Sequence, residues 1–356
     1  MRSILIVELT RLGDVVCMIP ALGRLRNAFP EAQITCVVQE QYASLLQALD
    51  INLQAVGCEG TQTFVGFGRG LGKARRIRAD LACSMSPAKR NAILTLGSRA
   101  PVKAGYLRYV NAQVQYLDKS PVYVTGRKTA AKVSYGREHL SLRAMKVCDA
   151  LGIPDAPLTT PVIRPEVLAQ AHQRIAPFLA GVRIPYVVLH PFASWVYKQW
   201  PVENFLRLAE RVVTELNSDV VVICEEGERQ DWQAASAGSL HSDRLHLFSS
   251  ASIVETAALL GGASVMVGND SGPLHLAGLV GIPLVGLYGP ASPDLTAPHG
   301  TRGVFLYKPV ACSPCAQTTC LHPENPCMNA IVINEVLAAM RTANGASAQH
   351  HASTYA

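Results

Sequence analysis

The sequence has few aromatic residues and no long apolar run. Aromatic residues make up 6% of the 356 residues although 49% are hydrophobic, so aliphatic side chains must fill the cores. Glu8, Arg11 and Asp14 interrupt the apolar N-terminus before it reaches the roughly 18 residues that span a bilayer. We therefore expect neither a membrane-spanning helix nor a signal peptide, and we expect a cytoplasmic protein. The length predicts about two domains.

The glycine-rich motif of dinucleotide-binding proteins is also missing. Residues 4–7 read as a strand, residues 10–14 as a turn, and the apolar spacing that follows as a helix to about residue 28. Gly13 is the one glycine in this turn, whereas a dinucleotide site needs a series of glycines. A dehydrogenase is therefore the least favoured enzyme class. Asp14 lies where the helix begins, either as a cap or as a carboxylate aimed into a cleft, and the spacing leaves both interpretations open.

Acidic residues are scarce in one part of the chain. The net charge is +6, and the stretch from Arg69 to Lys146 holds seventeen basic residues against Asp80, Asp118 and Glu138. Such a bias predicts an anionic partner, either a phosphorylated glycolipid, a membrane surface or a nucleic acid. The alternative is a solvated face that keeps the protein in solution.

The ten cysteines favour reduced thiols over a disulfide framework in a chain for which we expect no secretion. Four of them fall within sixteen residues, at Cys312, Cys315, Cys320 and Cys327. Four thiolates could bind structural zinc or iron tetrahedrally, although the spacing is not that of a standard zinc finger. The alternative is a packed, reduced loop.

Both halves of the chain alternate strands and helices, which predicts an α/β protein. Prolines become dense between residues 152 and 185 and mark the boundary between two domains. Residues 64–78 are rich in glycine and then in basic residues, and we expect mobile loops there. The predicted parts are a first domain over 1–165, a second over 166–330, a helix over 331–343 that packs back on the first domain, and a disordered tail over 344–356.

The most informative stretch is residues 263–279. An apolar run ends at Gly268, and helical spacing resumes after Asp270, Ser271 and Gly272. This pattern predicts a buried strand, a tight turn and a helix whose free N–H groups suit a diphosphate. Asp270 or Ser271 as a simple helix cap is the alternative. Residues 190–198, 225–228 and 269–275 all follow predicted strands, so we expect them to meet at one sheet edge as a binding site.

These motifs together resemble the heptosyltransferase family, the ADP-heptose:lipopolysaccharide heptosyltransferases of glycosyltransferase family nine. The resemblance implies a GT-B fold, with two Rossmann-like, doubly wound domains facing across a cleft. It also implies inversion at the anomeric carbon without a required metal or other cofactor, and the sequence has no Asp-x-Asp motif. The matching stretches span almost the whole chain: residues 4–7, 12–16, 20–22, 189–191, 198–201, 268–277 and 283–290.

The resemblance assigns roles to individual residues. Asp14 is expected to be the general base for the acceptor hydroxyl, and Lys198 the cation that neutralises the departing diphosphate. Asp270 is expected to hold hydroxyls of the donor sugar. Glu8 departs from the family, in which a basic or neutral residue is common at this position. The remaining expected site residues are Ser194, Ser271, Gly272 and His275 around the donor, Glu225 or Glu228 at its ribose, and Thr10, Arg11 and Gly13 on the acceptor side.

The expected reaction moves a heptose from ADP-heptose to a lipopolysaccharide core or a related anionic, lipid-linked acceptor. The basic first domain is expected to face the inner side of the cytoplasmic membrane without inserting, and no nucleic acid is expected as a partner. Two alternatives remain. One is transfer of heptose or another sugar to protein or to another glycan, and the other is a non-catalytic nucleotide-sugar binding protein.

Overall fold

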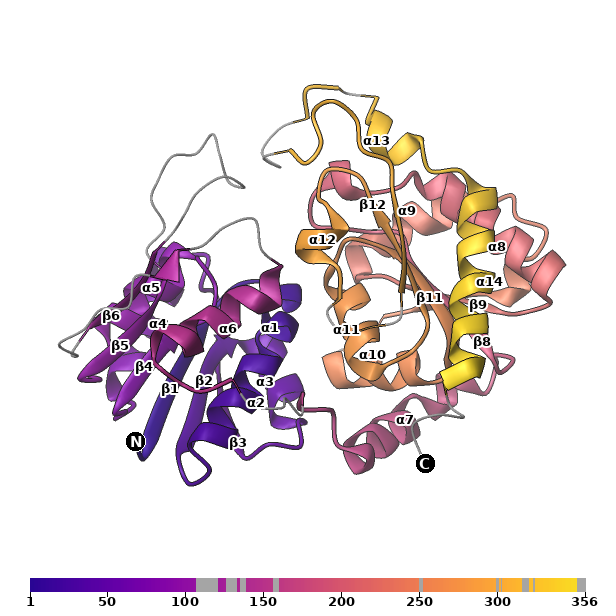
Figure 1. The fold of residues 1–356 in the computed structure, drawn as a ribbon. Coiled ribbons are helices and arrows are strands. Elements are labelled where there is room, and N and C mark those ends of the chain that lie inside the picture. Colours follow the sequence, from indigo (N-terminus) through magenta and orange to yellow (C-terminus); the bar gives the residue numbers. More distant parts are fainter. Residues whose placement is uncertain are drawn as a thin grey trace. The chain divides into compact units, whose positions relative to one another are not determined.

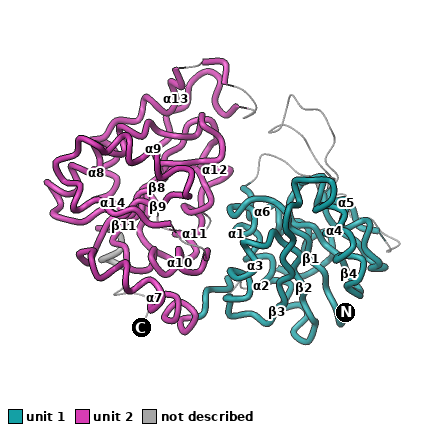
Figure 2. Tube along the Cα trace, turned by 180° about the vertical axis from the view of Figure 1, so that it is seen from behind, with its two compact units in different colours: residues 1–164 teal, residues 165–356 magenta. Residues whose placement is uncertain are grey.

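The chain divides into two compact units, residues 1–164 and 165–356 (Figure 2). The sequence predicted a boundary after residue 165. Part of the basic segment and the last residues of the predicted tail lie outside the described residues. The computed structural model describes residues 1–106, 121–125, 133–134, 139–155, 160–249, 252–298, 301, 303–315, 320–322 and 324–350.

Unit 1 is built on a sheet with the strand order β3-β2-β1-β4-β5-β6-β7 (Figure 1). The strands from β1 to β5 are parallel, whereas β6 and β7 pair antiparallel at one edge. Its strands are β1 (Ser3–Glu8), β2 (Gln33–Gln39), β3 (Leu53–Cys58), β4 (Leu81–Ser84), β5 (Val102–Tyr106), β6 (Pro121–Thr125) and β7 (Val133–Ser134), and its helices are α1 (Leu12–Cys17), α2 (Ile19–Ala28), α3 (Glu40–Gln47), α4 (Phe64–Arg76), α5 (Lys89–Gly97) and α6 (Leu140–Ala150).

The strand order of unit 1 reverses between β1 and β4. The chain first adds β2 and β3 on one side of β1, and then returns to place β4 on the other side. Residues that follow β1 and β4 therefore meet at the carboxyl edge of the sheet, at the point where open α/β sheets bind ligands. The central strands are fully buried because helices cover both faces, which explains their continuous apolar runs.

The expected loops in residues 64–78 are wrong, because most of this stretch forms α4. The Thr63 hydroxyl caps the helix by accepting from the Gly66 N–H at 3.1 Å. Phe67 and Leu71 recur at helical spacing and pack against the core of the unit. A side chain at Gly66 would collide with the Gly60 carbonyl oxygen, only 2.0 Å from an ideal Cβ position. The glycine at this position therefore allows close packing, and the sequence alone suggested mobility instead.

The predicted single helix over residues 15–28 is also divided, into α1 and α2. Pro20 lies in the first turn of α2, where its missing N–H costs no hydrogen bond. The break therefore separates a short helix that carries Asp14 from the longer helix that packs inside the unit.

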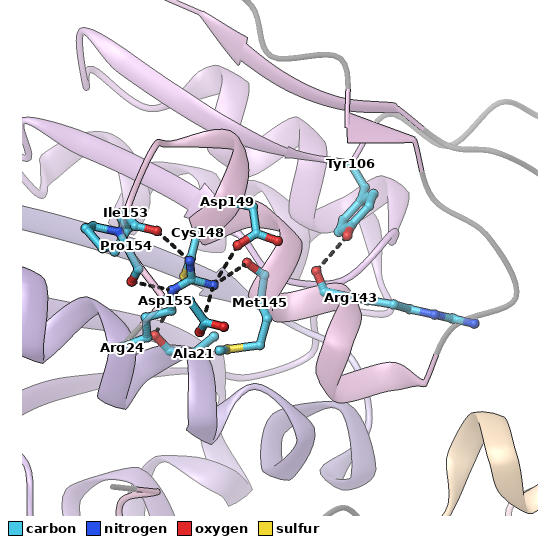
Figure 3. Close-up of polar contacts among 10 residues, drawn as sticks. All are labelled: Ala21, Arg24, Tyr106, Arg143, Met145, Cys148, Asp149, Ile153, Pro154 and Asp155. Carbon is cyan, nitrogen blue, oxygen red and sulfur yellow. Dashed lines mark hydrogen bonds and ion pairs between the residues drawn. The ribbon is translucent and has the colours of Figure 1, made fainter. Parts of the chain in front are cut away.

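Buried Arg24 on α2 ties down the end of α6 (Figure 3). Its guanidinium donates to the Asp149 carboxylate at 2.7 Å and to the carbonyl oxygens of Ile153 and, at 3.0 Å, Pro154. At the other end of α6, the Tyr106 hydroxyl donates to the Arg143 carbonyl oxygen at 2.6 Å. Figure 3 shows the Arg143 side chain extending away from these contacts. Both ends of α6 are thus fixed, and with them the backbone position from which Arg143 projects.

Unit 2 has a parallel sheet with the order β10-β9-β8-β11-β12-β13, which reverses between β8 and β11 (Figure 1). Its strands are β8 (Tyr186–His190), β9 (Val220–Ile223), β10 (Leu245–Phe248), β11 (Ala263–Asn269), β12 (Leu284–Tyr288) and β13 (Gly303–Tyr307). Its helices are α7 (Pro165–Leu179), α8 (Val202–Leu216), α9 (Glu226–Ser236), α10 (Ile253–Gly261), α11 (Gly272–Val280), α12 (Pro293–Thr296), α13 (Pro326–Asn329) and α14 (Ile333–His350), with short 3₁₀ turns at Val196–Lys198 and Ser242–Arg244.

The last helix, α14, differs from the sequence-based expectations in two ways. α14 packs against β11, β12, β13 and α8 of its own unit, whereas the sequence suggested that it packs back on the first domain. Val336, Leu337, Met340 and Ala343 recur at helical spacing and bury one face of α14 in the core. The helix also continues to His350, so residues 344–350 are not the disordered tail expected there. No helix in the described ranges is long and apolar enough to cross a membrane.

Candidate active site

The first candidate cluster lies at the carboxyl edge of the unit 1 sheet. Asp14 is half-buried in the first turn of α1. Burial raises the pKa of its carboxyl, while hydrogen bonds from the Thr10 hydroxyl and the Arg11 backbone, and the positive charges of Arg143 and Arg11, act in the opposite direction. The carboxyl is therefore poised to accept a proton more readily than an ordinary surface aspartate.

A second carboxyl, which the sequence marked only as a departure from the family, lies close to Asp14. Glu8 ends β1 and is fully buried. Its Oε1 atom contacts the Thr10 hydroxyl and accepts hydrogen bonds from Ser86 Oγ at 2.9 Å and Asn91 Nδ2 at 2.7 Å. Burial and the nearby Asp14 charge raise the pKa of Glu8 to about 7. An acidic residue that ends an otherwise apolar strand was the signal in the sequence.

The three residues predicted on the acceptor side occupy different places around Asp14. Thr10 contacts both carboxyl groups, and its backbone carbonyl accepts a hydrogen bond from the Gln39 side chain at 2.6 Å. Arg11 precedes α1 and its side chain is exposed, while Gly13 lies half-buried in the first turn. The structure thus places Thr10 inside the carboxylate cluster and Arg11 at its solvent side.

In unit 2, the residues around the strand reversal form a second cluster. Ser271 lies between β11 and α11, and its hydroxyl is 3.0 Å from His190 Nδ1 at the end of β8. Burial lowers the pKa of His190 to about 4, so its ring is neutral near pH 7. Asn269 holds the neighbouring loop, because its side chain accepts from the Trp200 N–H at 3.0 Å and donates to the Pro191 carbonyl at 2.7 Å. The loop that carries Lys198 is therefore fixed against the end of β11.

Lys198 and Asp270 form a nearly buried ion pair. Lys198 Nζ lies 2.6 Å from Asp270 Oδ2, and the two side chains are only 13% and 6% exposed. The Thr296 hydroxyl also donates to Asp270 Oδ2, at 3.4 Å. The two residues to which the family resemblance assigned separate roles are therefore paired with each other in the structure.

The other predicted donor residues surround this pair at the same sheet edge. Gly272 begins α11 and His275 is buried in its first turn, while Ser194 is exposed in the loop after β8. Glu225 follows β9 and is exposed. Its N–H donates to the Glu228 carboxylate at 2.8 Å, and its own side chain accepts from the Glu228 N–H, so the two glutamates form a capping box at the start of α9.

The four clustered cysteines lie between β13 and α14. Cys312, Cys315 and Cys320 are half-buried and Cys327 is buried. Burial, with smaller contributions from Cys315 and Cys312, raises the pKa of the Cys327 thiol. Among the residues that the structure describes, no group of three or more His, Cys, Asp or Glu side chains is arranged to hold a metal ion.

Comparisons with known proteins match most of the chain. The sequence profile of glycosyltransferase family 9 (heptosyltransferase) matches residues 69–325, more than half of the chain. Lipopolysaccharide heptosyltransferase 1 of Pseudomonas aeruginosa is 26% identical over 344 residues, covering 90% of this chain and 87% of that protein.

Two solved structures have the same fold. E. coli ADP-heptose LPS heptosyltransferase II superposes with a TM-score of 0.71 at 17% identity, covering 98% of this chain and 99% of the other. E. coli heptosyltransferase WaaC with ADP gives a TM-score of 0.64 at 17% identity, with 94% and 96% covered. The expected GT-B fold, with two parallel-sheet domains, is confirmed.

Proposed function

The chain belongs to glycosyltransferase family 9, the heptosyltransferases, and on this premise we propose that it transfers a heptose from ADP-heptose to a lipopolysaccharide core or a related lipid-linked acceptor. It is a glycosyltransferase, as the resemblance in the sequence implied. Relatives named for lipopolysaccharide heptosyl transfer and a solved relative with ADP support the acceptor and the donor.

We place the acceptor chemistry at Asp14. An acceptor hydroxyl that attacks the anomeric carbon becomes acidic as the new bond forms, and a carboxylate within hydrogen-bond reach takes its proton. Attack from the face opposite the departing ADP inverts the configuration at the anomeric carbon. The raised pKa of Asp14 makes it a stronger base than an exposed aspartate.

The single observation that best supports ADP-heptose binding in unit 2 is the Lys198–Asp270 ion pair beside the start of α11. A diphosphate that reaches the free N–H groups of this helix competes with Asp270 for the lysine. When Lys198 turns to the diphosphate, the Asp270 carboxylate is released to accept hydrogen bonds from hydroxyls of the heptose. The lysine and the helix start together then stabilise the charge that builds on the departing ADP, and we propose no metal ion for this step.

The nucleotide preference of the protein tests directly whether ADP-heptose is the donor. Calorimetric titration in buffer with EDTA is expected to show ADP binding at least tenfold tighter than UDP or GDP. EDTA does not change the result if the site needs no metal. A preference for UDP or GDP would exclude ADP-heptose as donor, and the absence of any nucleotide binding would favour a non-enzymatic role.

The same edge of unit 1 supports a further part of the proposal, association with an anionic membrane surface from the cytoplasmic side. α1, α4 and α5 all begin at this edge, because each follows a strand of the parallel part of the sheet. Phe64 is 93% and Val65 62% exposed at the start of α4, while Arg11 and Lys89 are exposed at the starts of the other two helices. Apolar side chains beside cations suit an anionic lipid surface.

Vesicle binding tests this association. The double variant Phe64→Ser/Val65→Ser is expected to bind phosphatidylglycerol-containing vesicles about tenfold more weakly than the unaltered protein, because two apolar side chains no longer enter the interface. Leu240→Ser is the matched control, since Leu240 is 91% exposed but lies in unit 2. Equal binding by all three proteins would contradict a membrane role for the start of α4.

A further inference from the structure

Two carboxyl groups share one hydroxyl at the carboxyl edge of unit 1. The Thr10 hydroxyl contacts Glu8 Oε1 and also forms a hydrogen bond with the Asp14 carboxyl. A hydroxyl has only one hydrogen to donate. If both carboxyl groups were ionised, one of these two contacts would place two acceptor oxygens against each other. Each of the two contacts in the chain from Glu8 through Thr10 to Asp14 therefore has its own hydrogen only when one carboxyl group carries a proton.

The surroundings of Glu8 show where this proton lies. The Asn91 amide is oriented by its Oδ1, which accepts from the Leu9 N–H at 2.8 Å, so its Nδ2 faces Glu8 Oε1 and also donates to Ser86 Oγ at 2.9 Å. The Ser86 hydroxyl is thus left to donate to Glu8. The Oε2 atom of Glu8 is buried without a hydrogen-bond partner in the described part of the chain. Two neutral donors and an unpartnered oxygen are poor compensation for a buried negative charge.

Burial raises the pKa of Asp14 as well, but Asp14 has nearby cations that Glu8 lacks. The charged groups that act on the two carboxyls from neighbouring elements are Arg11 at the start of α1 and Arg143 on α6, and both favour the ionised form of Asp14. The strongest influences on Glu8 are burial, Asp14 and the side chains of Thr10, Asn91 and Ser86, and none of these is a cation. The negative charge is therefore more stable on Asp14 and the proton on Glu8.

We propose that Glu8 is a positioning residue that keeps a proton around neutral pH and donates it in a hydrogen bond to Thr10, whose hydroxyl in turn donates to Asp14. The pair then carries one negative charge, on the carboxyl that accepts the proton of the acceptor hydroxyl. This inference rests on the proposed function for the role of Asp14, whereas the protonation of Glu8 itself does not depend on any reaction.

The protonation is measured without activity, by nuclear magnetic resonance of protein labelled with carbon-13 at the glutamate side-chain carboxyl. We expect one glutamate resonance to titrate near pH 7, to be absent from Glu8→Gln, and to titrate at lower pH in Asp14→Asn because the neighbouring charge is gone. Glu31→Gln removes an exposed glutamate of the same unit and is expected to leave this resonance unchanged. A late-titrating signal that survives Glu8→Gln, or none above pH 5.5, would overturn the proposal.

Stability gives a second readout. The native protein keeps the Glu8 proton up to about pH 7, whereas the unfolded chain releases it near 4.5. The contribution of this proton to the free energy of unfolding is thus fully present below about pH 4.5 and is lost as the pH rises through 7. Melting temperatures of Glu8→Gln are expected to fall less between pH 5 and 8 than those of the unaltered protein or Glu31→Gln. An equal fall in all three proteins would contradict the proposal.

Kinetics then separate a positioning role from a merely structural one. Above pH 7 the ionised Glu8 adds a second negative charge beside Asp14, which repels an anionic acceptor. The KM for the acceptor is expected to rise about fivefold between pH 6 and 8.5 in the unaltered enzyme and in Glu31→Gln, and to stay flat in Glu8→Gln. A loss of activity in Glu8→Gln that is uniform across pH would indicate a structural role only. Absence of turnover on every acceptor would refute the proposed function, while the resonance titration would still decide the state of Glu8.

Discussion

Asp14→Asn is expected to lower kcat with ADP-heptose and a lipopolysaccharide-type acceptor by about 10²–10⁴-fold, the range that a well-placed general base contributes. Asparagine has nearly the same shape as aspartate and keeps one acceptor oxygen for the hydrogen bonds of this site, so α1 should keep its position. It has no oxygen basic enough to take the proton of the acceptor hydroxyl. The expected loss is therefore in kcat, with little change in folding.

Two control measurements show whether the loss of kcat in Asp14→Asn comes from the loss of the base. ADP binds to unit 2 in our proposal, so the Kd of Asp14→Asn for ADP is expected to equal that of the unaltered protein. Glu31→Gln removes an exposed carboxylate from the same unit and should keep full turnover. An Asp14→Asn enzyme within tenfold of the unaltered kcat would exclude Asp14 as the base. In the active enzyme, the raised pKa of Asp14 means that activity falls on acidification at a higher pH than for an ordinary aspartate.

Lys198→Met is expected to weaken ADP binding and to lower kcat by about 10²–10³-fold, comparable with removal of a donor that stabilises transition-state charge in other enzymes. The change also leaves the Asp270 carboxylate nearly buried without its 2.6 Å partner, which by itself destabilises the protein. Thermal unfolding must therefore be measured beside the kinetics, at a temperature where the variant is folded.

The partner residue provides the decisive comparison. Asp270→Asn removes the competitor that holds Lys198, so ADP affinity is expected to stay the same or to increase, while turnover falls because heptose hydroxyls lose an acceptor. Lys198→Arg keeps the charge and is expected to bind ADP more tightly than Lys198→Met. If the Lys198→Met and Asp270→Asn variants weakened ADP binding equally, the ion pair would be a structural element and the lysine would not contact the diphosphate.

Local signals in the sequence were sufficient for most of the fold and for the family. Buried parallel strands read as continuous apolar runs, so the strands before Asp270 and His190 were predicted within a residue or two. Residues 303–307 were missed, although they form the edge strand β13, because this short run is only half-buried and lacks the long apolar pattern of the central strands. The resemblance to the heptosyltransferase family is confirmed, and it rested on motifs that spread over both units.

The candidate site was predicted as a set of residues but not as a set of contacts. Lys198 and Asp270 are 72 residues apart, and only the pairing of β8 with β11 brings them to one edge. The convergence of strand ends was foreseeable, because parallel strands end on the same side of a sheet. Which side chains pair there depends on the loop that Asn269 fixes, and no spacing in the sequence encodes that contact.

The sequence by itself determined the α/β class, the two-part organisation, the strand-turn-helix at residues 263–280 and the family, because each depends on local periodicity or on motifs that act over a few residues. Tertiary structure alone decided that the glycine-rich stretch after Thr63 is a helix, that the last helix covers its own sheet, and that Glu8 shares a hydroxyl with Asp14. These features depend on close packing and on burial, which raise or lower the free energy of a group only once distant parts of the chain surround it.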